Sequence, residues 1–269
     1  MMDWSTLSQA QRDLAYNNNT AVPDAPAMIA ERLAASALMP PPVGAQAFGP
    51  SEREQWDLWP ASEPGAPILV FIHGGYWQRN RRQDFWAIAE GALAMGWGFA
   101  LNGYALAPDA TPTQITWQVH AALDWLSSHG AEHGMTGPIV LSGWSAGGHL
   151  TAMGAEHPAV AAGVAISGIF ELGPIRDTYL NEKLALTDEE IMSLSPIRRP
   201  VVQKPIAVVY GSAELPELCR QSRDFHAMRA AAHAPGPLVP VPAANHFTVL
   251  EALRRPGGAL LRVAAELLR

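Results

Sequence analysis

Short, uninterrupted apolar runs alternate along this chain with longer amphipathic segments, and this alternation is the feature that most constrains its fold. The runs are rich in β-branched and aromatic residues and lie at Ile68–His73, Trp97–Leu101, Ile139–Leu141, Gly163–Ile166, Ile206–Tyr210 and Leu238–Val241. A strand without polar alternation is typical of a sheet that is buried on both faces. The segments between the runs predict helices at Gln83–Met95, Thr113–His129, Ala146–His157 and Glu217–Ala232, with a further pair after His246. The sequence therefore predicts an α/β fold with a mostly parallel central sheet and helices on both of its faces.

The length and composition suit one large hydrophobic core. Of the 269 residues, 48% are hydrophobic and only 16% are charged, which is a low charged fraction for a soluble protein. We expect a single domain over residues 1–269, with an N-terminal arm and helix, at about 1–42, packing on it. The helix is predicted at Pro26–Leu38, because a proline suits a first helical turn and apolar residues recur there at helical spacing.

Charge and cysteine content exclude several classes of protein. The net charge of −7 makes the phosphate backbone of nucleic acid an unfavourable partner. One cysteine allows neither an internal disulfide nor a cysteine-rich zinc site. The N-terminus has no secretory signal pattern, and no apolar stretch is long enough to cross a bilayer. We expect a cytoplasmic protein with no metal, no cofactor and no membrane contact, and the low charge is compatible with a homodimer.

The most informative motif is Gly143-Trp144-Ser145-Ala146-Gly147, a G-x-S-x-G sequence between an apolar run and a helical segment. This context is the one in which a strand-to-helix turn presents a nucleophilic serine at the carboxyl end of a parallel sheet. The helix that follows points its first amides at any negative charge that develops beside the serine. A glycine-rich turn without catalysis is the alternative, and the context favours Ser145 as a nucleophile.

A second glycine motif, His73-Gly74-Gly75, follows the first apolar run. Glycine allows a backbone to approach a substrate closely, so Gly74 or Gly75 is predicted to offer amide N–H groups to an oxyanion, together with Ala146. We interpret His73 as a buried residue that orients this loop, and not as a base.

A serine hydroxyl needs a base and an acid that orients the base, and in folds of this kind both follow the serine in the chain. Glu214 lies in the loop after the run Ile206–Tyr210, and Glu217 competes with it as an acid that would also suit the first turn of a helix. We favour Glu214.

For the base we favour His246, which follows the run Leu238–Val241 and precedes a helical segment. The other histidines after the motif lie within helical or surface segments. His129 and His133 have a spacing that could hold a metal, but their polar, glycine-containing surroundings favour a surface loop.

Several longer strings in the chain resemble one known family, the kynurenine formamidases (arylformamidases) and their bacterial esterase-like relatives, which are α/β-hydrolases. The matching strings are HGGYW at His73–Trp77, GWSAGGHL at Gly143–Leu150, SGIFELGPI at Ser167–Ile175, LNEKLALTDEEIMSLSP at Leu180–Pro196 and ELPELCRQS at Glu214–Ser222. The resemblance implies an α/β-hydrolase fold and the catalytic residues Ser145, Glu214 and His246. The family usually has aspartate as the acid, so Glu214 departs from it by one methylene group.

The resemblance further implies hydrolysis of a small carboxylic ester or of an aryl formamide or amide, such as N-formylkynurenine, through an acyl-enzyme. Tyr76, Trp77, Trp144 and Phe170 are candidates to line an aromatic slot for the substrate, with core packing as the alternative for each. A general carboxylesterase without formamide preference, a non-catalytic ligand-binding homologue and a metal-dependent hydrolase are the competing functions. The last two are disfavoured, because all three catalytic residues are present and no metal-binding motif occurs.

Overall fold

The computed structural model describes residues 4–269, and within them the fold is built on a sheet of eight strands. The strands are β1 (Gln46–Ala47), β2 (Gln55–Trp59), β3 (Ile68–Ile72), β4 (Gly98–Asn102), β5 (Ile139–Trp144), β6 (Val160–Ile166), β7 (Ile206–Gly211) and β8 (Leu238–Val241). Their order across the sheet is β1-β2-β4-β3-β5-β6-β7-β8. From β4 across the sheet to β8, all neighbouring strands pair in parallel. At the other edge, β1 pairs antiparallel with β2, and β2 pairs antiparallel with β4. The predicted mostly parallel α/β sheet is therefore confirmed.

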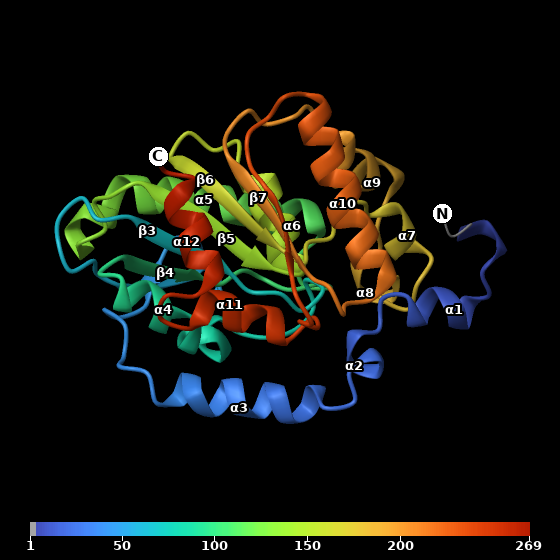
Figure 1. Ribbon diagram of the computed structural model, residues 1–269, viewed down its shortest axis with the longest axis horizontal. Helices are drawn as coiled ribbons and strands as arrows, with labels where there is room; N and C mark the ends of the chain where they lie inside the picture. Colours follow the sequence, from blue (N-terminus) through green and yellow to red (C-terminus); the bar gives the residue numbers. More distant parts are fainter. Residues whose placement is uncertain (1–3) are drawn as a thin grey trace.

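Helices cover both faces of this sheet (Figure 1). The α-helices are α1 (Gln9–Leu14), α2 (Asn18–Ala21), α3 (Ala25–Ala37), α4 (Ala89–Ala94), α5 (Pro112–His129), α6 (Ala146–Gly154), α7 (Gly173–Arg176), α8 (Asn181–Leu184), α9 (Asp188–Leu194), α10 (Pro216–Ala231), α11 (Glu251–Arg254) and α12 (Ala259–Glu266). Short 3₁₀ turns lie at Trp4–Thr6, Arg82–Ile88, Gly130–His133, Pro196–Arg198 and Thr248–Leu250. The helix predicted at Gln83–Met95 is thus a 3₁₀ turn followed by α4, and the one predicted at Ala146–His157 ends earlier, at Gly154.

Alternation along the strands divides the core into two layers. In β3, Ile68, Val70 and Ile72 point to the layer that contains α5 and α6. Leu69 and Phe71 point to the opposite layer, which contains α4, α11 and α12. Because successive side chains of a strand face opposite sides, a strand between two helical layers must be apolar at every position. This explains why the predicted strands read as continuous apolar runs.

The N-terminal arm crosses the outside of the α/β core and ends in α3, which lies along one edge of the molecule below α4 and α11 (Figure 1). Arg32 Nε and Ser36 Oγ of α3 both donate to the carbonyl oxygen of Asp84, each at 3.2 Å. Nearer the N-terminus, Tyr16 is fully buried, and its hydroxyl donates to Glu217 Oε1 at 3.1 Å. The arm is therefore attached to two regions that are far from it in the sequence.

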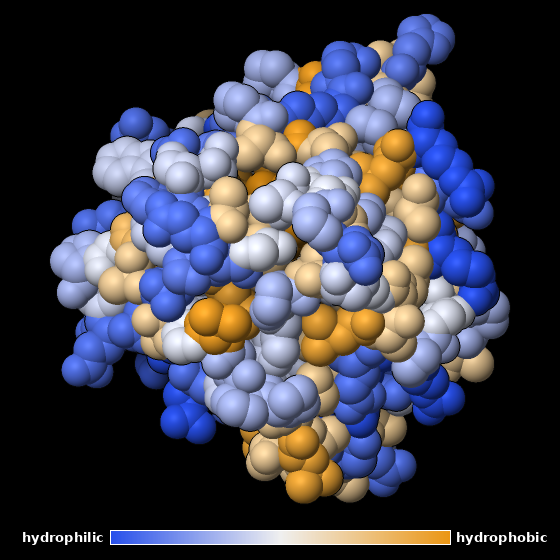
Figure 2. Space-filling view, turned by 90° about the vertical axis from the view of Figure 1, so that its left-hand side faces the viewer, coloured by the Kyte–Doolittle hydropathy of each residue, from blue (hydrophilic) through white to orange (hydrophobic). Residues whose placement is uncertain are grey.

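Apolar side chains at the surface belong to several separate elements. Within residues 4–269 the exposed large apolar side chains are Leu14, Leu33, Leu38, Val43, Met95, Trp117 and Met192. On the side of the molecule seen in Figure 2 the hydrophobic groups are small and separated by hydrophilic ones. None of the helices in the described part of the chain combines the length and the apolar character that crossing a bilayer requires.

Candidate active site

Ser145 lies on a tight turn between β5 and α6. Its φ of 60° and ψ of −120° place it in a region that non-glycine residues rarely adopt, and its amide donates to the carbonyl of Ile166 at 2.8 Å. A Cβ on Gly143 would lie 2.3 Å from the carbonyl oxygen of Gly147, and one on Gly147 would lie 2.0 Å from that of Ile72. Only glycine at these two positions lets α6 begin so close to the sheet. This geometry places Ser145 at the carboxyl end of β5.

The glycines after β3 lie directly beside this turn, because Ile72 pairs with Gly143 in the sheet. A Cβ on Gly74 would lie 2.9 Å from Ser145 Cβ, and Gly75, with φ of 119°, lines the same pocket as Ser145. Ala146 is the first residue of α6, so its amide has no acceptor within the helix. The structure therefore brings the three predicted oxyanion residues, Gly74, Gly75 and Ala146, close to Ser145.

The loop that follows Gly75 carries unusual backbone strain. Tyr76, Trp77 and Asn80 all have positive φ, at 51°, 57° and 75°. Asn80 Nδ2 donates to the Gly74 carbonyl at 3.0 Å, and the Tyr76 hydroxyl donates to the Tyr16 carbonyl at 2.5 Å. Strained backbone persists only where surrounding contacts hold it, and here these contacts fix the course of the loop.

His73 supports this loop from within the core. Its Nδ1 lies 2.8 Å from the Gly74 carbonyl oxygen, and its ring stacks on Tyr104 at 4.4 Å between centroids. The Tyr104 hydroxyl also donates to the His73 carbonyl at 2.8 Å. Burial lowers the pKa of His73 to about 4, so the ring is neutral at pH 7. These contacts agree with our interpretation of His73 as an orienting residue.

Glu214 and His246 come together in the loops after β7 and β8. His246 Nδ1 lies 2.7 Å from Glu214 Oε2, and both side chains are almost completely buried, with exposed fractions of 4% and 0%. The other carboxylate oxygen, Oε1, accepts from Ser167 Oγ at 2.5 Å and from the Gly211 amide at 2.6 Å. Because a carboxylate can only accept, Nδ1 of His246 carries the proton, and Nε2 is left to accept one.

Glu217, the competing acid, has different partners. It is in the first turn of α10, where Arg220 donates to it at 2.5 and 2.9 Å, and it also accepts from the Tyr16 hydroxyl. Of the two glutamates, Glu214 is therefore the one whose carboxylate meets His246.

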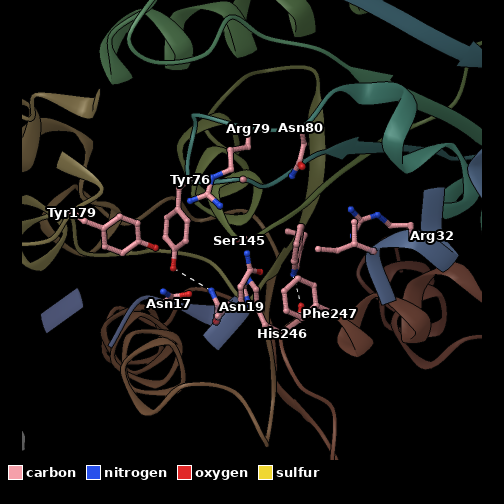
Figure 3. Close-up of a pocket in the computed structure, with 14 residues that line it drawn as sticks. Asn17, Asn19, Arg32, Tyr76, Arg79, Asn80, Ser145, Tyr179, His246 and Phe247 are labelled. Atoms are coloured by element: carbon pink, nitrogen blue, oxygen red, sulfur yellow. Dashed lines mark hydrogen bonds between the residues drawn. The ribbon is translucent and has the colours of Figure 1, made fainter. Parts of the chain in front are cut away.

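Ser145 and His246 line one pocket of about 160 Å³. Figure 3 shows both in the middle of this pocket, between Tyr76 and Tyr179 on one side and Arg32 on the other. The remaining lining residues are Asn17, Asn18, Asn19, Ile29, Gly75, Arg79, Asn80, Trp144 and Phe247. A cavity of this size suits a small substrate.

The four aromatic candidates divide into two pairs. Tyr76 and Trp144 line the pocket. Trp77 instead meets His149 edge-on at 5.0 Å, and Phe170 stacks on Phe225 at 4.3 Å; both are buried away from the residues that line the pocket. For Trp77 and Phe170 the structure places the side chain in core packing, because large apolar rings next to the strand ends also fill space between sheet and helices.

The sequence did not predict that the N-terminal arm would form a wall of the pocket. Asn17–Asn19 and Arg32 belong to that arm, and Arg79 and Tyr179 belong to loops without periodic patterning. The run of three consecutive asparagines at Asn17–Asn19 was the one available signal. Nothing in the sequence showed where that run would dock.

His129 and His133 flank Trp125, with centroids at 5.2 and 5.7 Å from its ring. Within residues 4–269 there is no group of three or more histidine, cysteine, aspartate or glutamate side chains arranged to hold a metal ion. The two histidines therefore act as stacking partners of a partly exposed tryptophan.

Comparisons with known proteins agree with this architecture. A family model described as BD-FAE matches residues 58–168. The kynurenine formamidase of Danio rerio is 27% identical over 278 residues, which cover 94% of each chain. Among solved structures, a candidate thioesterase from Silicibacter sp. TM1040 is 28% identical, with a TM-score of 0.83 over 94% of this chain and 98% of that one. Esterase B from Lactobacillus rhamnosis has 18% identity and a TM-score of 0.71 over 96% of both chains, a likeness in fold. The chain thus has an α/β-hydrolase fold and is similar to kynurenine formamidases and bacterial esterases.

Proposed function

We propose that this protein is a serine hydrolase that cleaves a small carboxylic ester or an aryl formamide or amide through an acyl-enzyme. The observation that carries the proposal is the 2.7 Å contact between Glu214 Oε2 and His246 Nδ1, next to a pocket that His246 shares with the strained Ser145. A nucleophile on a strand-to-helix turn, a histidine and a buried acid are the parts that acyl transfer needs.

In the proposed mechanism, His246 Nε2 takes the proton of the Ser145 hydroxyl as the oxygen attacks the carbonyl carbon. Glu214 stabilises the imidazolium that forms and keeps the proton on Nδ1. Amide N–H groups of Ala146 and of Gly74 or Gly75 stabilise the oxyanion. His246 then gives its proton to the departing alcohol or amine, and water, activated by the same histidine, releases the acid and restores Ser145.

Two arginines in the pocket favour substrates that carry a negative charge. Arg32 is almost fully buried, which lowers its pKa to about 10, so it is still charged at pH 7. Within residues 4–269, neither Arg32 nor Arg79 is among the arginines that form an ion pair with a carboxylate. The buried guanidinium of Arg32 lies over the Phe85 ring, 4.2 Å from its centroid, but has no carboxylate partner, and a carboxylate on the substrate would supply one. This favours an aryl formamide that bears a carboxylate, such as N-formylkynurenine, over a neutral ester.

The substrate class is tested by measuring kcat/KM for N-formylkynurenine, for formanilide as a neutral aryl formamide, and for p-nitrophenyl acetate. A preference of more than tenfold for N-formylkynurenine over both of the others supports the arylformamidase-like function. A preference for p-nitrophenyl acetate supports the alternative, a general carboxylesterase.

The serine mechanism is tested with Ser145→Ala, for which we expect loss of essentially all hydrolysis of p-nitrophenyl acetate with an unchanged circular dichroism spectrum. The Ser222→Ala variant is a matched control, because Ser222 is also fully buried but its hydroxyl bonds only to the backbone of α10. Activity retained by Ser145→Ala overturns the serine mechanism.

A further inference from the structure

Ser167 directly follows β6, the strand that lies between the strand of Ser145 and the strand that leads to Glu214. The residue is fully buried, and its amide donates to the carbonyl of Val209 in β7 at 2.7 Å. Its hydroxyl donates to Glu214 Oε1 at 2.5 Å. Ser167 therefore connects the backbone of the sheet to the acid that meets His246.

The two oxygens of Glu214 have separate partners. Oε1 accepts from Ser167 and from the Gly211 amide, whereas Oε2 faces His246. Two donors on Oε1, one from each neighbouring strand end, fix the rotation of the carboxylate group and so direct Oε2 to the imidazole. A glutamate needs this support more than an aspartate, because its side chain has one more rotatable bond to hold in place.

The backbone conformation of Ser167 is a second, independent indication that its hydroxyl is required. Its φ is 50°, in the left-handed region that glycine adopts without cost and that disfavours other residues. Glycine occupies the next position, Gly168, where an added Cβ would lie 2.5 Å from the Phe170 ring. A serine at a position whose backbone suits glycine indicates that the hydroxyl compensates for the strain.

We propose that Ser167 is a positioning residue of the hydrolysis reaction, holding the Glu214 carboxylate so that it orients His246. This inference rests on the proposed function. Ser167 touches neither the substrate nor the reacting atoms, and it acts through Glu214 alone.

The experiment compares Ser167→Gly and Ser167→Ala with the unmodified protein, using p-nitrophenyl acetate. We expect kcat to fall by about 10- to 100-fold in both variants, because small errors in the placement of catalytic groups have effects of this size, while KM changes less than about threefold. The acid limb of the kcat/KM–pH profile should move to lower pH, since a displaced carboxylate stabilises the imidazolium less. A purely structural role would not move that limb.

Thermal unfolding separates the two variants. Ser167→Gly removes the hydroxyl and also the backbone strain, whereas Ser167→Ala removes the hydroxyl and keeps the strain. We therefore expect Ser167→Gly to unfold at the higher temperature of the two while losing as much activity. If activity instead follows the melting temperature, the positioning role is wrong. Ser222→Ala again serves as the control and should retain kcat within about twofold.

A double-mutant cycle with Glu214→Gln completes the test. If Ser167 acts through Glu214, then Ser167→Gly added to Glu214→Gln should change kcat less than about twofold, and fully multiplicative losses would overturn the inference. The result also separates this inference from the proposed function. A large loss in Glu214→Gln with none in Ser167→Gly refutes only the role of Ser167, whereas full activity in Glu214→Gln and in Ser145→Ala refutes the proposed function itself.

Discussion

Two glutamates that are three residues apart, Glu214 and Glu217, are equally buried but contact different groups. Glu214 is in the loop at the carboxyl end of β7, and its carboxylate meets the imidazole of His246. Glu217 is in the first turn of α10, where it pairs with Arg220 and with the hydroxyl of Tyr16 from the N-terminal arm. The position at the end of a parallel strand, and not the residue type, therefore decides which acid meets His246.

Among substitutions of these two acids, the largest effect is expected for Glu214→Gln. Glutamine keeps the shape of the side chain but cannot stabilise the imidazolium, and its amide can present an N–H to Nδ1 and so favour the wrong tautomer of His246. We expect kcat for p-nitrophenyl acetate to fall on the order of 10⁴-fold, as with loss of a triad acid elsewhere. Steady-state kinetics measures it, and a loss below tenfold would mean that Glu214 is not the acid.

The matched substitution Glu217→Gln should change kcat less than about threefold. Its cost should appear in stability, because Arg220 loses its shortest ionic contact and the buried hydroxyl of Tyr16 loses a charged acceptor. We expect the free energy of unfolding to fall by about 1–3 kcal/mol, as measured by urea denaturation. A kcat loss as large as that of Glu214→Gln would erase the distinction between the two acids.

The smallest effect is expected for Tyr16→Phe, which removes only the hydroxyl by which the N-terminal arm contacts Glu217. Burial and the carboxylate of Glu217 raise the pKa of Tyr16 well above its usual value, so the hydroxyl stays protonated and donates. It also accepts from Gln221 Nε2 at 2.8 Å. Removing the hydroxyl should lower the free energy of unfolding by about 1–2 kcal/mol and leave kcat nearly unchanged. An unchanged urea midpoint would show that the arm is held by other contacts.

The sequence predicted the parallel sheet and the neighbourhood of Ser145 because both depend on local patterns. An apolar run indicates a strand that lies between two helical layers. The glycines at 143 and 147 indicate a helix that starts directly against the sheet. The antiparallel β1 and β2 were not predicted. The strand β2 contains Asp57, whose buried ion pair with Arg82 at 3.0 Å breaks the apolar pattern.

The part of the pocket wall that the N-terminal arm forms could not be predicted either, and the reason is different. Arg32 and the asparagines at 17–19 reach the pocket through docking contacts with residues much later in the chain, and such contacts leave no periodic signal. Nor could the sequence separate the aromatic residues that line the pocket from those that pack in the core. Trp77 and Tyr76 are neighbours in one strained loop, yet one packs into the core and the other faces the pocket, and only the backbone conformation separates them.

The hydrogen bond from the Tyr76 hydroxyl to the Tyr16 carbonyl, together with the one that Tyr76 accepts from Asn18, joins the arm to the loop of the predicted oxyanion donors. Because Asn17–Asn19 also line the pocket, an arm that left this position would take part of the pocket wall with it. A ligand that contacts this wall should therefore stabilise the docked arm, and by reciprocity the docked arm should strengthen binding by the same free energy. The slowest amide exchange of the arm should thus be found in the acylated protein, and an arm that is loosened from outside should weaken binding by the same free energy.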